Sequence, residues 1–196
     1  MNRPNGIGDA WTLLLQLGEL NRPFRSRELS ECRLPRAWLQ FTGISGLERL
    51  ACGTYGRRGR GYSRICVATR RVDRGFACLS SALWLHGLIP DEPADAWVCI
   101  RHKAWKPLAS STPNTQFVRT SRWPVLEDLC LLSRWNVPTT AMARTVVDFF
   151  RFRHRVGLPA AHKAFELVVG SGRCTAAEIE ACADRYQLRR WRPPTH

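Results

Sequence analysis

The order of helix and hairpin patterns in the first sixty residues constrains the fold of this chain most strongly. Apolar residues at positions 13, 14, 17 and 20 have the spacing of a helix with one buried face. The segment 21–23 ends this helix, a second short helix is predicted over 27–32, and Pro35 opens a third over 35–41. A turn at Cys52-Gly53 then joins two strands within 47–55. Three helices followed by a hairpin predict a winged helix-turn-helix.

A stretch rich in glycine and arginine follows the predicted hairpin. Residues 56–64 read GRRGRGYSR, in which glycine gives flexibility and arginine keeps the backbone solvated. We interpret this stretch as a wing tip or a linker. The sequence therefore predicts a winged-helix domain over 1–62, a basic linker over 63–75 and a second domain over 76–196.

The second domain has a mixed pattern. A helix is predicted over 78–88 and is closed by Gly87. Four short extended runs follow, at 96–100, 116–120, 129–133 and 137–140. Helical patterns then cover 140–153, 159–170 and a run from Thr175, where Thr175 and Glu178 form a capping box. The fold class is therefore α+β, with a winged helix-turn-helix followed by a mixed α+β domain that ends in helices.

The charge of the chain favours a polyanionic partner. The sequence holds 30 Lys and Arg against 16 Asp and Glu, a formal net charge of +14. Such an excess attracts and concentrates polyanions, so DNA, RNA and an anionic membrane all fit. Nearly all the basic residues are arginine, which suits bidentate contacts with phosphate or guanine, although GC-rich coding also enriches arginine.

The predicted third helix is the expected site of base recognition, because a recognition helix places its first turns against base edges. Arginine pairs with guanine and glutamine with adenine in the major groove. Arginines around this helix are expected to contact phosphates. The residues expected at DNA are Arg25, Arg27, Arg36, Gln40, Thr42, Arg49, Arg57, Arg58 and Arg60. A solvated helix face, or RNA binding with Tyr62 stacked on a base, are the alternatives.

Catalytic side chains are scattered, so we expect no enzyme and predict no catalytic residue. Acidic residues at 91–95 lie in a proline-rich loop as solvated carboxylates, and Ser80, Ser81 and His86 lack the GxSxG pattern of a nucleophile elbow. The eight cysteines show no zinc-ligand spacing, so neither a metal nor a cofactor is expected.

No stretch of the sequence has the roughly 20 apolar residues that cross a bilayer, and its first residues lack the apolar block of a signal peptide. We therefore expect a cytoplasmic protein without a membrane partner.

One helical segment carries a charged pattern. Arg144 and Asp148 stand four residues apart and share a face, a pair worth about 0.3–0.5 kcal/mol when exposed. Arg151 and Arg155 continue that face. The plain interpretation is a charged stripe that covers buried apolar residues.

Several segments, taken in order, resemble the AbiEi antitoxins of type IV toxin–antitoxin systems and the transcriptional regulators grouped with them. FRSRELSECRLPRAWLQ and GLERLACGTY resemble the winged helix of that family. Similarity to its C-terminal domain lies in CLSSALWLHGL, AWVCI, VPTTAMARTVVDFFRFRHRVGLPAAHKAF and TAAEIEACADRY. The resemblance covers most of the chain.

This resemblance implies a repressor that binds repeats in its own promoter, and an antitoxin that counters a nucleotidyltransferase-like toxin without a stable complex. It adds Pro35 and Trp38 to the recognition helix. Recurrent positions of the antitoxin domain, none with a known catalytic role, correspond to Ser80, Ser81, Arg144, Thr145, Asp148, Arg151 and Arg153. Gly43 and Gly46 interrupt the family's longer recognition helix, and Cys52 replaces a residue that is commonly basic.

Two other functions stay open. One is a solitary winged-helix regulator without a toxin, which the neighbouring gene would distinguish. The other, less favoured, is a DNA-processing nuclease, which would cleave plasmid with Mg²⁺ or Mn²⁺. A dimer on DNA is also open, because winged helices that bind repeats often act in pairs.

Overall fold

A computed structural model describes residues 22–31, 46–107, 114–132 and 136–188 of the chain. The predicted helices over 10–20 and 35–41 lie outside these residues. So do five of the residues expected at DNA, namely Pro35, Arg36, Trp38, Gln40 and Thr42.

The N-terminal unit contains a small antiparallel sheet. Strand β1 (Phe24–Arg25) leads into helix α2 (Ser26–Glu31), and the hairpin follows as β2 (Leu47–Ala51) and β3 (Thr54–Arg57). The strand order is β1-β3-β2. Gly53, with φ of 69°, takes the left-handed conformation in the turn between β2 and β3. The second helix and the hairpin are therefore confirmed, and β1 is an additional strand.

The expected linker over 63–75 instead contains a helix, α3 (Arg64–Arg71). The Ser63 side chain caps this helix by accepting a hydrogen bond of 3.1 Å from the Cys66 amide. Ile65 and Ala68 are buried against the second sheet. The linker prediction was wrong because the arginines of this segment hide a short apolar face on one side of a helix.

The second unit is built on a five-stranded sheet. The strands are β4 (Phe76–Ala77), β5 (Ala96–Arg101), β6 (Thr115–Thr120), β7 (Leu129–Leu132) and β8 (Val137–Thr140). Their order is β6-β5-β4-β8-β7. Strand β5 runs parallel to β6, and β4 parallel to β8, whereas the β4–β5 and β7–β8 pairs are antiparallel. The four predicted strands are confirmed; the central strand β4, two residues long, was not predicted.

Alternating residues of β5 serve two cores, as the pleat of a strand requires. Val98 and Ile100 pack with α3 on one face of the sheet. Cys99 packs on the other face, against helices that follow β4 in the chain. A sheet covered on both faces explains why its strands are mostly apolar.

Beyond β4, the described part of the chain forms five helices. They are α4 (Leu79–Leu85), α5 (Met142–Arg151), α6 (Arg153–Val156), α7 (Leu158–Gly170) and α8 (Ala176–Arg185), and a 3-10 turn η3 (Leu126–Asp128) precedes β7. The predicted helices are confirmed, although the run over 140–153 is divided between α5 and α6. The capping box of Thr175 and Glu178 is also present. Helices and strands together place the described chain in the α+β class.

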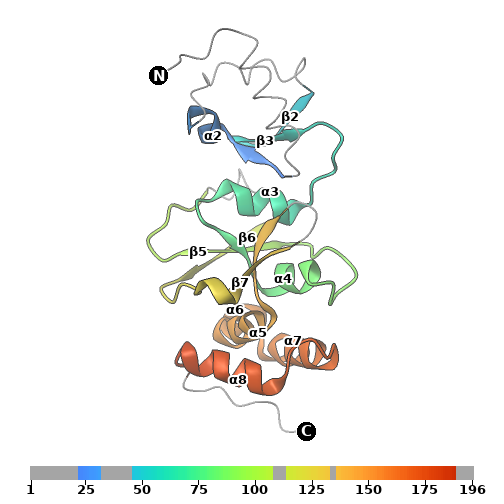
Figure 1. The fold of residues 1–196 in the computed structure, drawn as a ribbon, viewed down its shortest axis with the longest axis vertical. Coiled ribbons are helices and arrows are strands. Elements are labelled where there is room, and N and C mark those ends of the chain that lie inside the picture. Colours follow the sequence, from blue (N-terminus) through green and yellow to red (C-terminus); the bar gives the residue numbers. More distant parts are fainter. Residues whose placement is uncertain (1–21, 32–45, 108–113, 133–135, 189–196) are drawn as a thin grey trace.

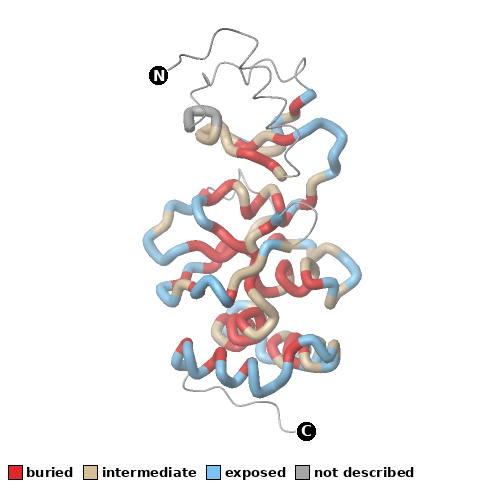
Figure 2. The backbone as a smooth tube through the Cα atoms, viewed as in Figure 1, coloured by how far each residue is buried: buried red, intermediate tan, exposed pale blue. Residues whose placement is uncertain are grey.

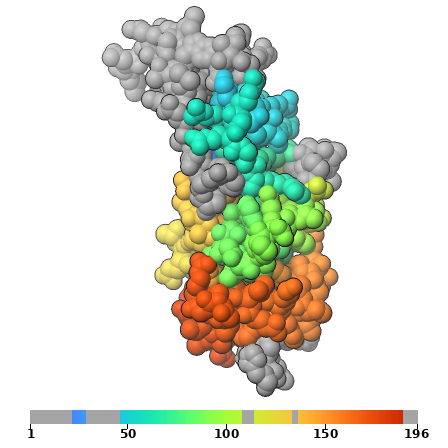
Figure 3. Space-filling model, turned by 90° about the vertical axis from the view of Figure 1, so that its right-hand side faces the viewer, coloured from blue at the N-terminus to red at the C-terminus, as the bar shows by residue number. Residues whose placement is uncertain are grey.

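The elements form successive layers along the long axis of the molecule (Figure 1). The three-stranded sheet comes first, then α3, the five-stranded sheet, and finally the layer of α5, α7 and α8. Buried residues lie mainly in α3, in the strands and in the helices below them (Figure 2). A view from a second direction shows the same succession from the hairpin to the C-terminal helices (Figure 3). No helix in the described part of the chain has the length and apolar character of a membrane span.

Candidate nucleic-acid interface

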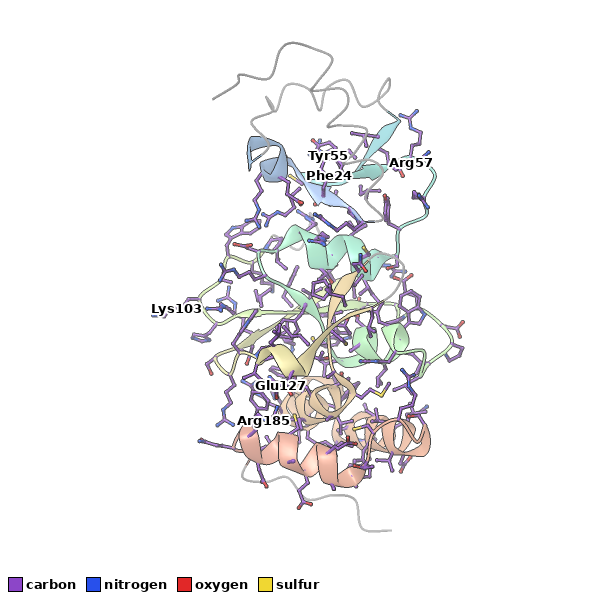
Figure 4. The ribbon with its side chains drawn as sticks, viewed as in Figure 1. Phe24, Tyr55, Arg57, Lys103, Glu127 and Arg185 are labelled. Atoms are coloured by element: carbon purple, nitrogen blue, oxygen red, sulfur yellow. The ribbon has the colours of Figure 1, made fainter. Side chains whose placement is uncertain are left out.

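The β2–β3 hairpin presents two arginines on one face. Its register sets Arg49 opposite Tyr55, and Arg57 opposite Leu47. Tyr55 stacks on Phe24 of β1, with ring centroids 6.1 Å apart. Phe24 and Leu47 are buried, whereas both arginines are exposed at the rim of the same face. Figure 4 shows Phe24 and Tyr55 side by side and Arg57 at the outer edge of the unit.

Two more exposed arginines, Arg58 and Arg60, follow β3 directly. The Arg58 amide donates a hydrogen bond of 2.8 Å to the carbonyl of Gly46. Gly59 and Gly61, with φ of 74° and 58°, take left-handed conformations that turn the chain toward α3. We call Arg49, Arg57, Arg58 and Arg60 the hairpin arginines.

The arginine-rich stretch is not the tip of the hairpin. The tip is the turn at Cys52 and Gly53, and there the Gly53 carbonyl accepts a hydrogen bond of 2.9 Å from the Ser26 amide. The stretch instead leaves the opposite end of β3 and connects it to α3. Of the two interpretations made from the sequence, the structure therefore supports a connecting segment.

Tyr62 packs within the N-terminal unit. A Cβ atom at position 56 would overlap the Tyr62 ring, so Gly56 is what allows the ring to lie against β3. The Tyr62 hydroxyl accepts a hydrogen bond of 3.1 Å from the Arg57 amide. These contacts account for Tyr62 without base stacking, which weakens the case for RNA.

Arg25 and Arg27 do not lie with the hairpin arginines. Both line a cavity between α2 and the end of α3, together with Arg70 and Arg74. Arg27 pairs with Asp73 across this junction at 2.6 Å. The structure therefore divides the predicted phosphate contacts into two groups on different sides of the unit.

The charged pattern on α5 is buried, which corrects the expectation of an exposed stripe. Neither Arg144 nor Asp148 has any exposed surface. Their Nε and Oδ1 atoms lie 3.0 Å apart, an ion pair whose atoms are not aligned for a hydrogen bond. Burial raises the pKa of the Asp148 carboxyl, and the charges of Arg144 and Arg151 oppose this effect. The pair is buried because α8 packs on α5 and because Tyr186 and the Arg122 carbonyl lie against Arg144.

Tyr186, at the end of α8, covers the buried pair. The guanidinium carbon of Arg144 lies 3.7 Å from the centroid of the Tyr186 ring. The Tyr186 hydroxyl donates to Oδ2 of Asp128, and Arg185 donates to Oδ1 of the same carboxylate at 2.9 Å. Burial and this bond to Asp128 raise the pKa of Tyr186. No local pattern in the sequence relates Asp128 to Tyr186, because the two lie far apart in the chain.

The other recurrent positions of the second unit also make structural contacts. The Ser81 hydroxyl accepts a hydrogen bond of 2.7 Å from the Trp97 amide. The Thr145 hydroxyl lies 2.7 Å from that of Thr140. Arg153 donates to the Phe150 carbonyl at 2.9 Å. Ser80 is half-buried on α4, and Arg151 lies beside Asp148 at 3.9 Å.

His86 and Ser81 do not form a nucleophile–base pair. The Nε2 atom of His86 lies 2.8 Å from the Thr140 carbonyl oxygen. Because a carbonyl oxygen only accepts, Nε2 bears the hydrogen and donates this hydrogen bond. Burial is the main cause of a lowered pKa for His86. Among the other polar groups considered from the sequence, Glu92 accepts a hydrogen bond of 3.3 Å from the Ile65 amide at the start of α3.

Within residues 22–31, 46–107, 114–132 and 136–188, no three His, Cys, Asp or Glu side chains gather as metal ligands would. Comparison of the chain with models of known protein families, and with curated proteins, gives no match.

Proposed function

We propose that this protein is a DNA-binding transcriptional regulator that docks on duplex DNA through its N-terminal unit. The observation that carries this proposal is the group of hairpin arginines, which lie exposed beside a three-stranded sheet in a protein of net charge +14. Arginines presented from a hairpin suit phosphate contacts, which fix the register of a protein on DNA. The second helix, the hairpin and the pairing of β1 with β3 are consistent with a winged helix.

The antitoxin role rests on the resemblance described above. In that proposal, the protein represses its own operon and counters a nucleotidyltransferase-like toxin. Arg144, Thr145 and Asp148 are buried, so their part in that role is to hold the second unit together. A solitary regulator is the alternative, and a neighbouring gene without a nucleotidyltransferase would favour it.

The proposal is tested by measuring fluorescence anisotropy of the full chain on a duplex from its own upstream region, over a chloride series. Each phosphate contact contributes about 0.9 to the slope of log affinity against log salt. We expect Arg58→Gln/Arg60→Gln to bind more weakly and to reduce the slope by about 1.8 if both arginines contact phosphates.

A matched control removes two exposed charges from the second unit, with Lys103→Gln/Lys163→Gln. Figure 4 shows Lys103 pointing away from the body of the protein, below the N-terminal unit. This variant should keep the affinity and slope of the wild type. Equal losses in both variants would mean that general charge attracts the DNA, and the proposed interface would then be rejected.

Sequence recognition is a separate readout. Arg36→Ala removes the side chain expected to pair with guanine, and one lost bidentate contact reduces discrimination by about 1–3 kcal/mol. The preference of this variant for the upstream duplex over a scrambled duplex of the same length should then fall by about 5- to 150-fold. If the wild type already fails to distinguish the two duplexes, the protein is not a sequence-specific regulator.

A further inference from the structure

A cavity of about 240 Å³ lies at the junction of α2, α3 and the segment that follows α3. Arg25 and Arg27 line it from the N-terminal unit. Arg70 lines it from α3, and Arg74 from the segment before β4. Glu28 is the one acidic side chain among the described residues of its wall. The cavity therefore carries a strong excess of positive charge.

Glu28 offsets only part of this charge, and both of its oxygens already accept hydrogen bonds from other groups. Oε2 accepts from Arg22 at 2.9 Å, and Oε1 accepts from the backbone amide of Arg25 at 2.8 Å. The Asp73 carboxylate, which follows α3, pairs with Arg27 at 2.6 Å. Among the described residues, neither the Arg25 nor the Arg70 side chain forms an ion pair within 4 Å, although Glu28 attracts both at longer range.

Two guanidinium nitrogens that belong to residues lining this cavity are buried and unsatisfied. Arg25 Nη1 and Arg70 Nε have almost no exposed surface and find no acceptor among the described residues. A buried donor without an acceptor is costly, and more so when it is charged. Guanidinium groups with unmet hydrogen-bonding capacity, on residues that line a cavity, favour binding of an acceptor that the chain itself does not supply.

The electrostatics agree with this geometry. Burial lowers the pKa of Arg25, and the neighbouring Arg27 lowers it further. Burial also lowers the pKa of Arg70, with Arg22 as the next contribution. An anion between these side chains would relieve both the desolvation and the repulsion.

We propose that this cavity binds a small phosphate-class oxyanion, such as inorganic phosphate, pyrophosphate or a compact phosphate ester. Arginine is the side chain best suited to such groups, because its planar donors match the geometry of phosphate oxygens. The cavity is smaller than the roughly 300–1,000 Å³ of sites for drug-sized ligands, which favours a compact ligand.

The position of the site gives the ligand a second effect. Arg25 and Arg27 belong to β1 and α2, whereas Arg70 belongs to α3, which packs on the second unit. An oxyanion held by both groups stabilises the junction in the way that the Arg27–Asp73 pair does. Binding therefore stiffens the attachment of the N-terminal unit. This proposal goes beyond DNA binding and does not depend on it.

The test is calorimetric titration of the full chain with pyrophosphate, with NaCl added to hold the ionic strength constant. We expect saturable binding by the wild type and a rise in Tm that grows with ligand concentration, because the ligand binds only the folded state. Arg70→Gln should weaken binding by about tenfold or more, which is the effect of losing one charge-assisted hydrogen bond. Arg25→Gln should act similarly and provides a second variant if the first folds poorly.

The control is Arg58→Gln, which removes an exposed arginine outside the cavity and should bind pyrophosphate within about twofold of the wild type. Without ligand, Arg70→Gln should melt no lower than the wild type, because it removes a half-buried charge that forms no ion pair within 4 Å among the described residues. Equal affinity in the wild type, Arg70→Gln and Arg25→Gln would overturn the proposal, as would the absence of saturable binding.

The same variants separate a free oxyanion from a DNA phosphate. If the cavity binds the free ligand, Arg70→Gln keeps the duplex affinity of the wild type while it loses pyrophosphate. If the cavity instead receives the DNA backbone, Arg70→Gln loses duplex affinity and the wild type does not bind pyrophosphate. The second result would reject the small-ligand site and leave the proposed DNA interface standing.

Discussion

Arg144 and Asp148 show how far the energetics of one residue pair depend on burial. Their spacing of four residues predicts a contact on a helix, and that contact is present at 3.0 Å. The sequence does not predict the burial, because the cover comes from Tyr186 and from the Arg122 carbonyl, which accepts a bond of 3.1 Å from Arg144. Both belong to other parts of the chain. Complete burial converts a weak surface pair into one whose members depend strongly on each other.

This dependence can be measured by substitution. Arg144→Met leaves the Asp148 carboxylate buried without its main partner, and removing one member of a buried pair costs about 3–5 kcal/mol. Arg144→Met/Asp148→Leu removes both charges and should destabilise the protein less than the sum of the single changes. Urea unfolding gives the free energies of unfolding of Arg144→Met, of Asp148→Leu and of the double variant.

Lys163→Met, an exposed change on α7, is the control and should stay within about 0.5 kcal/mol of the wild type. Additive effects of the two single substitutions would show that Arg144 and Asp148 are not coupled, contrary to the structure.

Among the helices and strands, the sequence best predicts the features that depend on residues close together in the chain. The four predicted strands and the Thr175 capping box depend on residues within a few positions of one another, and all are present. Strand β4 and helix α3 were missed for different reasons. Two residues are too few for an alternating pattern. The apolar face of α3 is short, and arginines at both of its ends resemble a solvated linker.

The helical state of α3 predicts where trypsin cuts the folded protein. Arg57 ends β3, and Arg58 and Arg60 lie in the irregular connection that follows it; all three are exposed, whereas Arg71 is buried at the end of a helix. Proteolysis requires local opening, which is easier in exposed segments with few buried contacts. Within residues 57–71, cleavage should therefore occur at 57–60 first.

Mass spectrometry of a brief digestion identifies the new termini. Ile65→Ala, which weakens the packing of α3 on the sheet, should accelerate cleavage at Arg70 and Arg71. Early cleavage at those two arginines in the wild type would instead support the linker first expected from the sequence.

For the whole molecule, α3 explains how the two units are joined and why only part of the candidate site was predictable. The hairpin arginines were predicted, because they are adjacent in sequence and a hairpin places them together. The cavity brings Arg25 together with Arg70, and their separation along the chain gives no sign of it. Its position also separates Arg25 and Arg27 from the hairpin arginines, with which the sequence analysis had grouped them.

The net charge of +14 also has a consequence for the stability of the molecule in the absence of any partner. Like charges repel in the compact state, and salt reduces this repulsion. Between about 0.01 M and 0.1 M NaCl, the Debye length falls from about 30 Å to about 10 Å, so repulsion between distant arginines is largely screened. Tm of the free protein should therefore rise, by about 2–4 °C for each kcal/mol relieved in a chain of this size. Duplex affinity should fall over the same range, because salt weakens phosphate contacts. Thermal unfolding followed by circular dichroism tests the first trend.

The Arg58→Gln/Arg60→Gln variant, with two fewer charges, should start from a higher Tm and gain less from salt. A Tm that falls as salt is added would mean that attractive pairs such as Arg27–Asp73 outweigh the repulsion.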